Sequence, residues 1–292
     1  MPRKRDRAIT PCRREPAVEQ AVDSYAAELK RQAASIGNHG LPEKEFWRSG
    51  IFRGAIEKLR GEQAASMADK RAFVADVLNW MKSEGRIASW FAAGGSDRHD
   101  YEVMLPGGTI CGIEAKGCMD GNNTNIFQRP RNSDEFVIWS LCQNPGADPR
   151  HNAWSGIHTR LSAEIIHRGK VVDGLIIWDD LCGSVGRPCP RTSGNNSRLT
   201  KIGERLVPPP CIYLFPRTVP DPRNNIKPMV HKLDKVKFLK ALYDTFQCLP
   251  EDVTEVEIEA GLIGTSTARR TRLIRGGEVI AESVMTAIKR AK

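Results

Sequence analysis

Residues 98–117, RHDYEVMLPGGTICGIEAKG, read as two apolar segments joined by a Pro-Gly-Gly turn. Apolar residues in alternation on either side of a glycine-rich turn are typical of a β-hairpin. The same stretch carries a carboxylate at each end, Asp100 and Glu114, and a lysine, Lys116. Because charged groups in a half-buried strand pair are costly without a partner, this hairpin raises the question of what holds them there.

The register of the hairpin follows from the position of its turn. With the turn at residues 106–108, Leu105 faces Thr109, and counting outward from that pair places Asp100 opposite Glu114. Directly opposed residues share one face of the sheet, with Cβ atoms about 4.5–5.5 Å apart. A two-residue turn at the glycines would shift the register by one residue and remove this opposition.

Two opposed carboxylates raise the pKa of each other, so such a pair is kept mainly when a cation lies between them. A set of oxygen ligands suits Mg²⁺ or Mn²⁺. Lys116 shares the face of Glu114 because strand side chains alternate with period two, and it can hold a water or neutralise charge on a phosphate. The alternative is a surface hairpin with a Glu–Lys pair on its solvent face.

The net charge of +9 favours an anionic partner, nucleic acid first and an acidic membrane surface second.

These residues resemble the PD-(D/E)xK nuclease motif, with Asp100 as the aspartate, Glu114 as the acidic residue and Lys116 as the lysine. His99 stands where the motif has proline, and Asp97, three residues before Asp100, is a second candidate for the aspartate. The family includes most type II restriction endonucleases, together with resolvases, exonucleases and repair nucleases. Its core is a mixed sheet that begins with such a hairpin and is flanked by helices.

The resemblance implies a role for each residue of the motif. Asp100, Glu114 and the backbone carbonyl of Ala115 would bind Mg²⁺, for which Mn²⁺ can substitute, and Lys116 would orient the attacking water. Many members add a glutamate from the preceding helical region, for which the candidates are Glu57 and Glu84.

The 292 residues, 40% of them hydrophobic, are enough for a substantial core. We expect an N-terminal helical region with a basic arm at residues 1–65 and a nuclease core at 66–292, together forming one compact α/β (mixed α+β) domain. In the core, 66–86, 155–169 and 232–246 read as helices. Strands are expected at 101–105, 109–117, 171–179, 211–215 and 253–264, with a short one before the glycine-rich loop at 93–97. Residues 134–142 fit a strand or a helix, 183–210 a long loop, and the tail from 266 a strand, a turn and a helix.

Polar and basic residues outside the motif are candidates for contacts with DNA bases and phosphates. These residues come from four places: the segment after Lys116, the start of the helix at 155–169, the long loop, and the tail strand, on which two arginines share a face. The alternative for each is a solvated surface segment. The predicted contacts are Asn122, Asn123, Asn125, Arg129, Arg131, His158, Arg160, Arg191, Arg198, Arg270 and Arg272.

The eight cysteines are expected to be thiols, since no apolar run reaches the length of a membrane span and the basic start lacks a secretory signal. We therefore expect a cytoplasmic protein. Cys182 and Cys189 are separated by six residues, whereas zinc pairs usually have two to four between them, so a structural zinc is not expected.

Together with these features, the resemblance to the nuclease family predicts a Mg²⁺-dependent endonuclease that cleaves double-stranded DNA at a specific sequence, as a type II restriction endonuclease and a homodimer of a restriction-modification system. A DNA repair or junction-resolving nuclease of the same fold is the nearest alternative. A non-catalytic nucleic-acid-binding protein is the alternative from another class, and it would have no use for the three motif residues.

Overall fold

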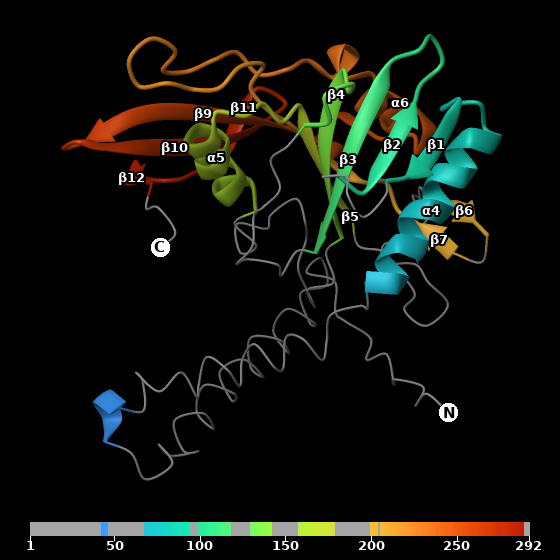
Figure 1. The fold of residues 1–292 in the computed structure, drawn as a ribbon, viewed down its shortest axis with the longest axis horizontal. Helices are drawn as coiled ribbons and strands as arrows, with labels where there is room; N and C mark the ends of the chain where they lie inside the picture. The colour runs from blue at the N-terminus through green and yellow to red at the C-terminus, as the bar shows by residue number, and fades with distance from the viewer. Residues whose placement is uncertain are drawn as a thin grey trace.

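The computed structural model describes residues 42–45, 67–93, 99–117, 129–141, 157–178, 199–203 and 205–288. The predicted N-terminal helical region and arm therefore lie almost wholly outside the described residues. Figure 1 shows the elements in chain order. They are α4 (Met67–Ser83), β1 (Ser89–Ala92), β2 (Tyr101–Met104), β3 (Ile110–Gly117), β4 (Glu135–Leu141), α5 (Ile157–Arg168), β5 (Gly174–Trp178), β6 (Thr200–Ile202), β7 (Arg205–Val207), β8 (Cys211–Leu214), η2 (Leu233–Lys235), α6 (Lys237–Thr245), η3 (Pro250–Asp252), β9 (Val253–Ile263), β10 (Ser266–Arg275), β11 (Glu278–Glu282) and β12 (Thr286–Ala287).

One mixed sheet organises the described part of the chain. Its strand order is β1-β2-β3-β4-β5-β8-β9-β10-β11, with β12 paired to β10. β3, β4 and β5 run parallel to one another, whereas β1, β2 and β3 form an antiparallel set. The expected α/β mixed fold, with an antiparallel hairpin in its sheet, is confirmed.

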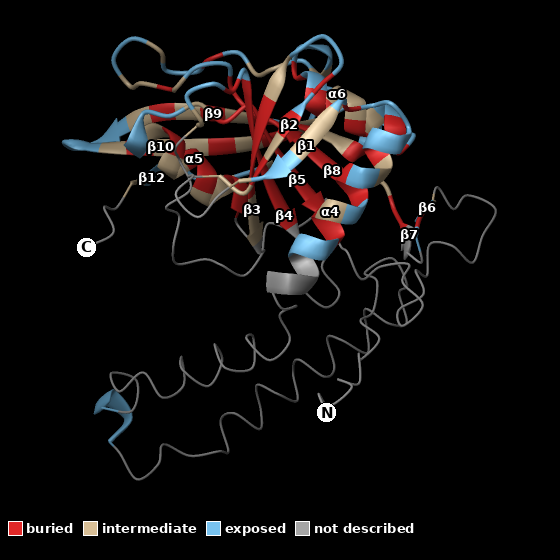
Figure 2. Cartoon of the chain, turned by 45° about the vertical axis from the view of Figure 1, so that its right-hand side comes forward, coloured by how far each residue is buried: buried red, intermediate tan, exposed pale blue. Residues whose placement is uncertain are grey.

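Helices cover both faces of this sheet. Alternate residues of β4 point in opposite directions, so that Trp139 packs with α4 and α6 whereas Ile138 packs with α5. Trp178 lies in the core between the sheet and helices α4 and α6. Its ring centroid is 4.6 Å from that of Phe246 and 5.3 Å from that of Phe73. Figure 2 shows the buried residues gathered in the central strands, while the tip of the β9–β10 hairpin is exposed.

The apolar face predicted for the first core helix is confirmed in α4, because all five of its members are fully buried: Phe73, Val74, Val77, Leu78 and Met81. Gly85 stops the helix as predicted, two residues beyond its last residue, Ser83, and its φ of 66° favours glycine. The amide of Arg86 donates to the carbonyl of Met81, and that of Gly85 to Lys82, the paired bonds that close a helix C-terminus. None of the described helices combines the length and apolar character needed to cross a bilayer.

Two expectations for irregular and helical segments are wrong. The predicted loop at 183–210 contains the two-stranded pair β6–β7, and most of its remainder lies outside the described residues. The tail after the Gly276–Gly277 turn is not a helix, because Glu278–Glu282 forms β11 and pairs with β10. The segment 134–142, open between strand and helix, is the strand β4. Pairing with a long neighbouring strand outweighs the helix-forming residues of the tail.

Candidate active site

The hairpin has the predicted register. Tyr101 pairs with Ile113 and Met104 with Ile110, and the amide of Leu105 donates to the carbonyl of Thr109 across the turn. Gly107 and Gly108 have φ angles of 93° and 84°, which explains why glycines occupy these two turn positions. The register that places Asp100 and Glu114 at the same end of the hairpin is thus confirmed.

Asp100 lies on a bend one residue before β2, just beyond the last strand pair. Its amide donates to the carbonyl of Ile113 (2.9 Å), and its carbonyl accepts from the amide of Ala93 (2.9 Å). Its Oδ2 accepts from the amide of Ala115 (2.8 Å). The expected direct opposition is therefore modified: Asp100 bonds to the residues on both sides of Glu114, and three hydrogen bonds fix its backbone and carboxylate.

Glu114 and Lys116 form an ion pair on one face of β3, with 2.7 Å between Oε1 and Nζ. Glu114 is only 8% exposed. Burial raises the pKa of the Glu114 carboxyl above its ordinary value, the hydrogen bond and charge of Lys116 act in the opposite direction, and the charge of Asp100 raises it further. The predicted sharing of a face is confirmed, and the glutamate is held where its negative charge is poorly hydrated.

The site lies at the carboxyl end of the parallel strands. In the β3–β4 register, Glu114 is next to Ile138 and Lys116 is next to the fully buried Ser140. Ligands of open α/β sheets bind at this end of the strands, because the loops that leave it diverge around a crevice. The position of the motif in the sheet is thus one at which catalytic groups are commonly found.

The side chains at the site suit a divalent cation, but they supply only part of the ligands that it needs. In the described part of the chain no group of three or more acidic, histidine or cysteine side chains is placed to hold a metal ion, so Asp100 and Glu114 would need additional ligands. The N–H and C=O groups of one strand residue point toward the same neighbouring strand. The carbonyl of Ala115 therefore points to the side on which its amide bonds to Asp100. Two carboxylates, one carbonyl and water match the preferences of Mg²⁺.

Of the two candidate glutamates, only Glu84 lies among the described residues, and it is not at the site. Glu84 follows the end of α4 and is exposed. The amide of Ala88, four residues later, bonds to Met104 at the turn end of the hairpin, away from Glu114. The proposal for Glu84 is therefore wrong on position. Glu57 and the alternative aspartate Asp97 lie outside the described residues.

His158 does lie at the start of α5, but its predicted contact with DNA phosphate is not compatible with its burial. The residue is 5% exposed and its ring stacks on Tyr213, with centroids 6.0 Å apart. Burial, with a smaller contribution from the charge of Arg160, lowers the pKa of His158 to about 4, so that the imidazole is neutral near pH 7. Arg160 is partly exposed on the same turn, and its DNA contact stays a prediction.

Arg129 and Arg131 lie near the amino end of β4, away from Lys116. Pro130 between them packs over Gly112, where an added Cβ would meet its ring carbons at 2.9 Å. Arg129 donates to the carbonyl of Ser133 and lies 3.7 Å from the carboxylate of Asp173. At these positions the chain has returned to the end of the sheet opposite Lys116, and the DNA contacts of Arg129 and Arg131 stay a prediction.

Arg270 and Arg272 share a face of β10 as predicted, but both guanidinium groups are ion-paired with glutamates. They do not form an unpaired basic strip, and their contact with DNA stays a prediction. The remaining predicted contacts lie outside the described residues: Asn122, Asn123, Asn125, Arg191 and Arg198. The same holds for Cys182 and Cys189, whereas Cys111, Cys211 and Cys248 are buried and are not joined in disulfides, as expected.

The sequence reasoning missed two polar residues beside Asp100. The Nε2 atom of His99 is buried, has no hydrogen-bond partner among the described residues, and lies 4.0 Å from the carboxylate of Glu102. Glu102 is two residues from Asp100, and period-two alternation was the signal that could have found it.

Comparison with models of protein families, with curated proteins and with solved structures finds no match to this chain.

Proposed function

We propose that the protein is a Mg²⁺-dependent endonuclease that hydrolyses phosphodiester bonds of double-stranded DNA at a specific sequence, as type II restriction endonucleases do. One observation carries the proposal. A carboxylate fixed by the backbone of its neighbours, Asp100, lies beside the ion pair of the buried Glu114 with the partly exposed Lys116, at the carboxyl end of parallel strands. Holding a buried glutamate next to a second acid and a half-buried lysine costs stability, so a chemical use for them is the simplest account.

Each residue has a task in this reaction. Mg²⁺ held by Asp100, Glu114 and the Ala115 carbonyl would supply Lewis acidity and lower the pKa of a bound water. Asp100 needs little reorganisation, because its Oδ2 is already positioned by the Ala115 amide. Lys116, 21% exposed at its side chain, can hold the attacking water by hydrogen bonds and offset the charge that builds on the phosphate oxygens.

The proposal includes a homodimer, because one active site cuts one strand per encounter and a duplex has two strands. It also includes a cytoplasmic location. The net charge of +9 supports a nucleic-acid partner through phosphate attraction. A non-catalytic DNA-binding protein would use the same net charge but would have no use for the ion pair of the buried Glu114 with Lys116. The motif itself therefore favours an enzyme over a binding module.

The test is incubation of the purified protein with several plasmids and linear duplexes in Mg²⁺ or Mn²⁺, followed by gel electrophoresis. Discrete fragments that are absent with Asp100→Ala and with Lys116→Ala would support sequence-specific cleavage. A smear would favour the repair or exonuclease alternative, and cleavage confined to branched DNA would favour a resolvase. DNA that is bound but left intact with both metals would contradict the proposal.

A further inference from the structure

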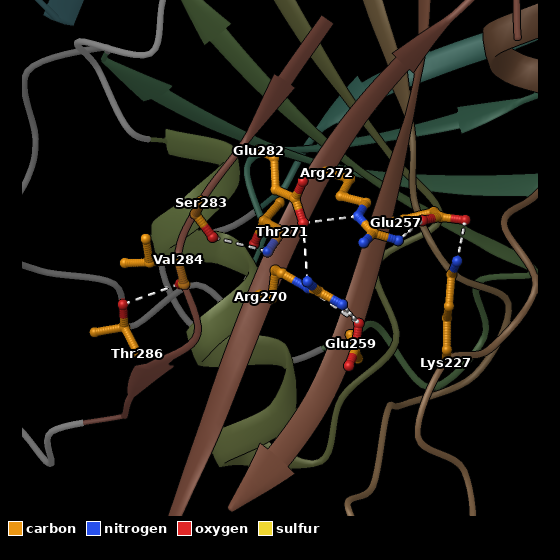
Figure 3. Close-up of polar contacts among 10 residues, drawn as sticks. All are labelled: Lys227, Glu257, Glu259, Arg270, Thr271, Arg272, Glu282, Ser283, Val284 and Thr286. Carbon is orange, nitrogen blue, oxygen red and sulfur yellow. Dashed lines mark hydrogen bonds and ion pairs between the residues drawn. The ribbon is translucent and has the colours of Figure 1, made fainter. Parts of the chain in front are cut away.

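The middle of the β9–β10 hairpin carries two acids facing two arginines. Glu259 accepts from Arg270 at 2.5 Å, and Glu257 lies 3.7 Å from Arg272. The register explains the pairing, because Arg270 is directly opposite Glu259 and Arg272 directly opposite Glu257. β9 is thus an acidic column and β10 a basic column on one face of the sheet (Figure 3).

A further column lies on each side of these two. On the β11 side, Glu282 accepts from Arg272 at 2.9 Å and lies 3.0 Å from Arg270. On the β9 side, Lys227 lies 2.8 Å from Glu257, on a loop that runs along the β9 edge. The hydrogen bond from Arg272 lowers the pKa of Glu282 below its ordinary value, so the carboxylate is charged at neutral pH. We call the six residues the charge ladder: Lys227, Glu257, Glu259, Arg270, Arg272 and Glu282.

The charge ladder lies on the face of the hairpin that points away from α5. Thr271 and Leu273, which alternate with the arginines, are buried on the α5 side, and Arg269 donates to the Thr159 carbonyl of α5. The ladder side chains, in contrast, keep between 20% and 43% exposure. This face is therefore accessible in the single chain, and a partner that approaches it meets fixed charges.

The order of the columns makes the face complementary to itself. From the loop across β9 and β10 to β11, the signs run positive, negative, positive, negative, and the three acids balance the three bases. A two-fold axis parallel to the strands, between β9 and β10, places the acidic column of one copy over the basic column of the other. The same rotation places Lys227 over Glu282. An isologous contact requires such self-complementarity.

We propose that a second copy of the chain docks on the charge ladder, face to face, about a two-fold axis parallel to β9 and β10. Two sheets packed face to face with nearly aligned strands are a common arrangement. A nucleic acid fits this face less well, because its phosphates would meet as many acids as bases. The inference does not depend on the nuclease proposal, since the association requires no DNA and no metal.

Charge complementarity of this kind fixes register and speeds encounter more than it adds affinity, and it weakens with salt. The ladder charges already have partners within the chain, so each gains a second partner in the dimer. We therefore expect a reversible dimer whose dissociation constant rises at least about tenfold when the salt concentration increases from about 0.05 M to about 0.5 M.

The first test measures the mass of the full chain in solution by sedimentation equilibrium, without DNA. Arg270→Glu with Arg272→Glu, and separately Glu257→Arg with Glu259→Arg, place like charges across the two-fold axis and should each give monomers. An equimolar mixture of the two variants should form heterodimers, which also shows that both are folded. Lys170→Glu with Lys235→Glu, a matched reversal at exposed lysines outside the ladder, should dimerise as the wild type does.

A second test uses the wild-type chain, so it does not rely on the folding of any variant. A zero-length carbodiimide cross-linker should join Lys227 of one copy to Glu282 of the other in the covalent dimer. A monomeric wild type, a dimer that survives both reversals, a mixture that stays monomeric, or a covalent dimer lacking this cross-link would overturn the proposal. DNA affinity lost in the arginine variant with an unchanged mass would overturn it in favour of a nucleic-acid contact.

Discussion

Replacing Lys116 by methionine removes the ammonium group that lies 2.7 Å from Glu114 Oε1. The carboxylate, 8% exposed, is then left beside Asp100 without its counter-charge. Two unit charges about 4 Å apart interact with about 4 kcal/mol at an effective dielectric constant of about 20. Part of this lost attraction is offset, because the lysine ammonium no longer has to be removed from water on folding. We therefore expect a net loss of about 1–3 kcal/mol in the free energy of unfolding at pH 7.

The matched variant removes both charges. Glu114→Gln combined with Lys116→Met should unfold within about 1 kcal/mol of the wild type, because the desolvation cost of the pair disappears with the pair. The sign of the pH dependence follows from Glu114, whose folded pKa is raised above 4.5. The folded state then binds its proton more tightly, so its contribution to stability falls as the pH rises above that value, and more steeply without Lys116.

Urea unfolding in EDTA, followed by tryptophan fluorescence at about pH 5 and about pH 7, measures these differences. The Lys116→Met variant should lose more stability at the higher pH, and the double variant should show neither loss. If Lys116→Met were as stable as the wild type at pH 7, the ion pair would contribute nothing, and the reasoning about a poorly hydrated glutamate would fail.

Three further substitutions test the packing and electrostatics of the sheet and its helices by the same unfolding measurement. Gly174→Ala should cost about 1–3 kcal/mol, because its Cβ would lie 2.3 Å from a methyl carbon of Leu239; an unchanged midpoint would contradict this close packing. Glu135→Ala should cost about 1–2 kcal/mol, because this carboxylate accepts two amides at the start of α6. His158→Phe should reduce the loss of stability between pH 6.5 and about 4, since the folded histidine, with its pKa lowered to about 4, resists protonation over that window; an identical acid profile would show that His158 is not the group responsible.

The sequence predicted the local parts of the fold well, because each carries its own signal. The apolar face of α4 follows helical spacing and ends at a glycine with positive φ, and the Pro-Gly-Gly turn sets the hairpin register. These features depend on contacts within about twenty residues. The same is true of the shared face of Glu114 and Lys116, which follows from strand alternation alone.

Features that depend on the whole sheet were not predictable from local patterns. The bend at Asp100 is fixed by bonds to Ala93, just after β1, and to Ala115 on β3, and one chain segment does not reveal them. His158 looked like a polar residue at a helix start, but the packing of α5 on β8 buries it against Tyr213. The segment after Gly277 is a different case, because its pairing with β10 across the two-glycine turn is local but its residues also suit a helix.

The measurement that tests the central claim most directly is the rate at which supercoiled plasmid is nicked or linearised in Mg²⁺ and in EDTA. Asp100→Ala and Lys116→Ala are compared with Asp234→Ala and Lys235→Ala, which remove an exposed ion pair of the same residue types from η2. We predict cleavage only with the metal, retained by both η2 variants and reduced at least about a hundredfold in both site variants. Cleavage that persists in EDTA, or in either site variant at the wild-type rate, would contradict the account.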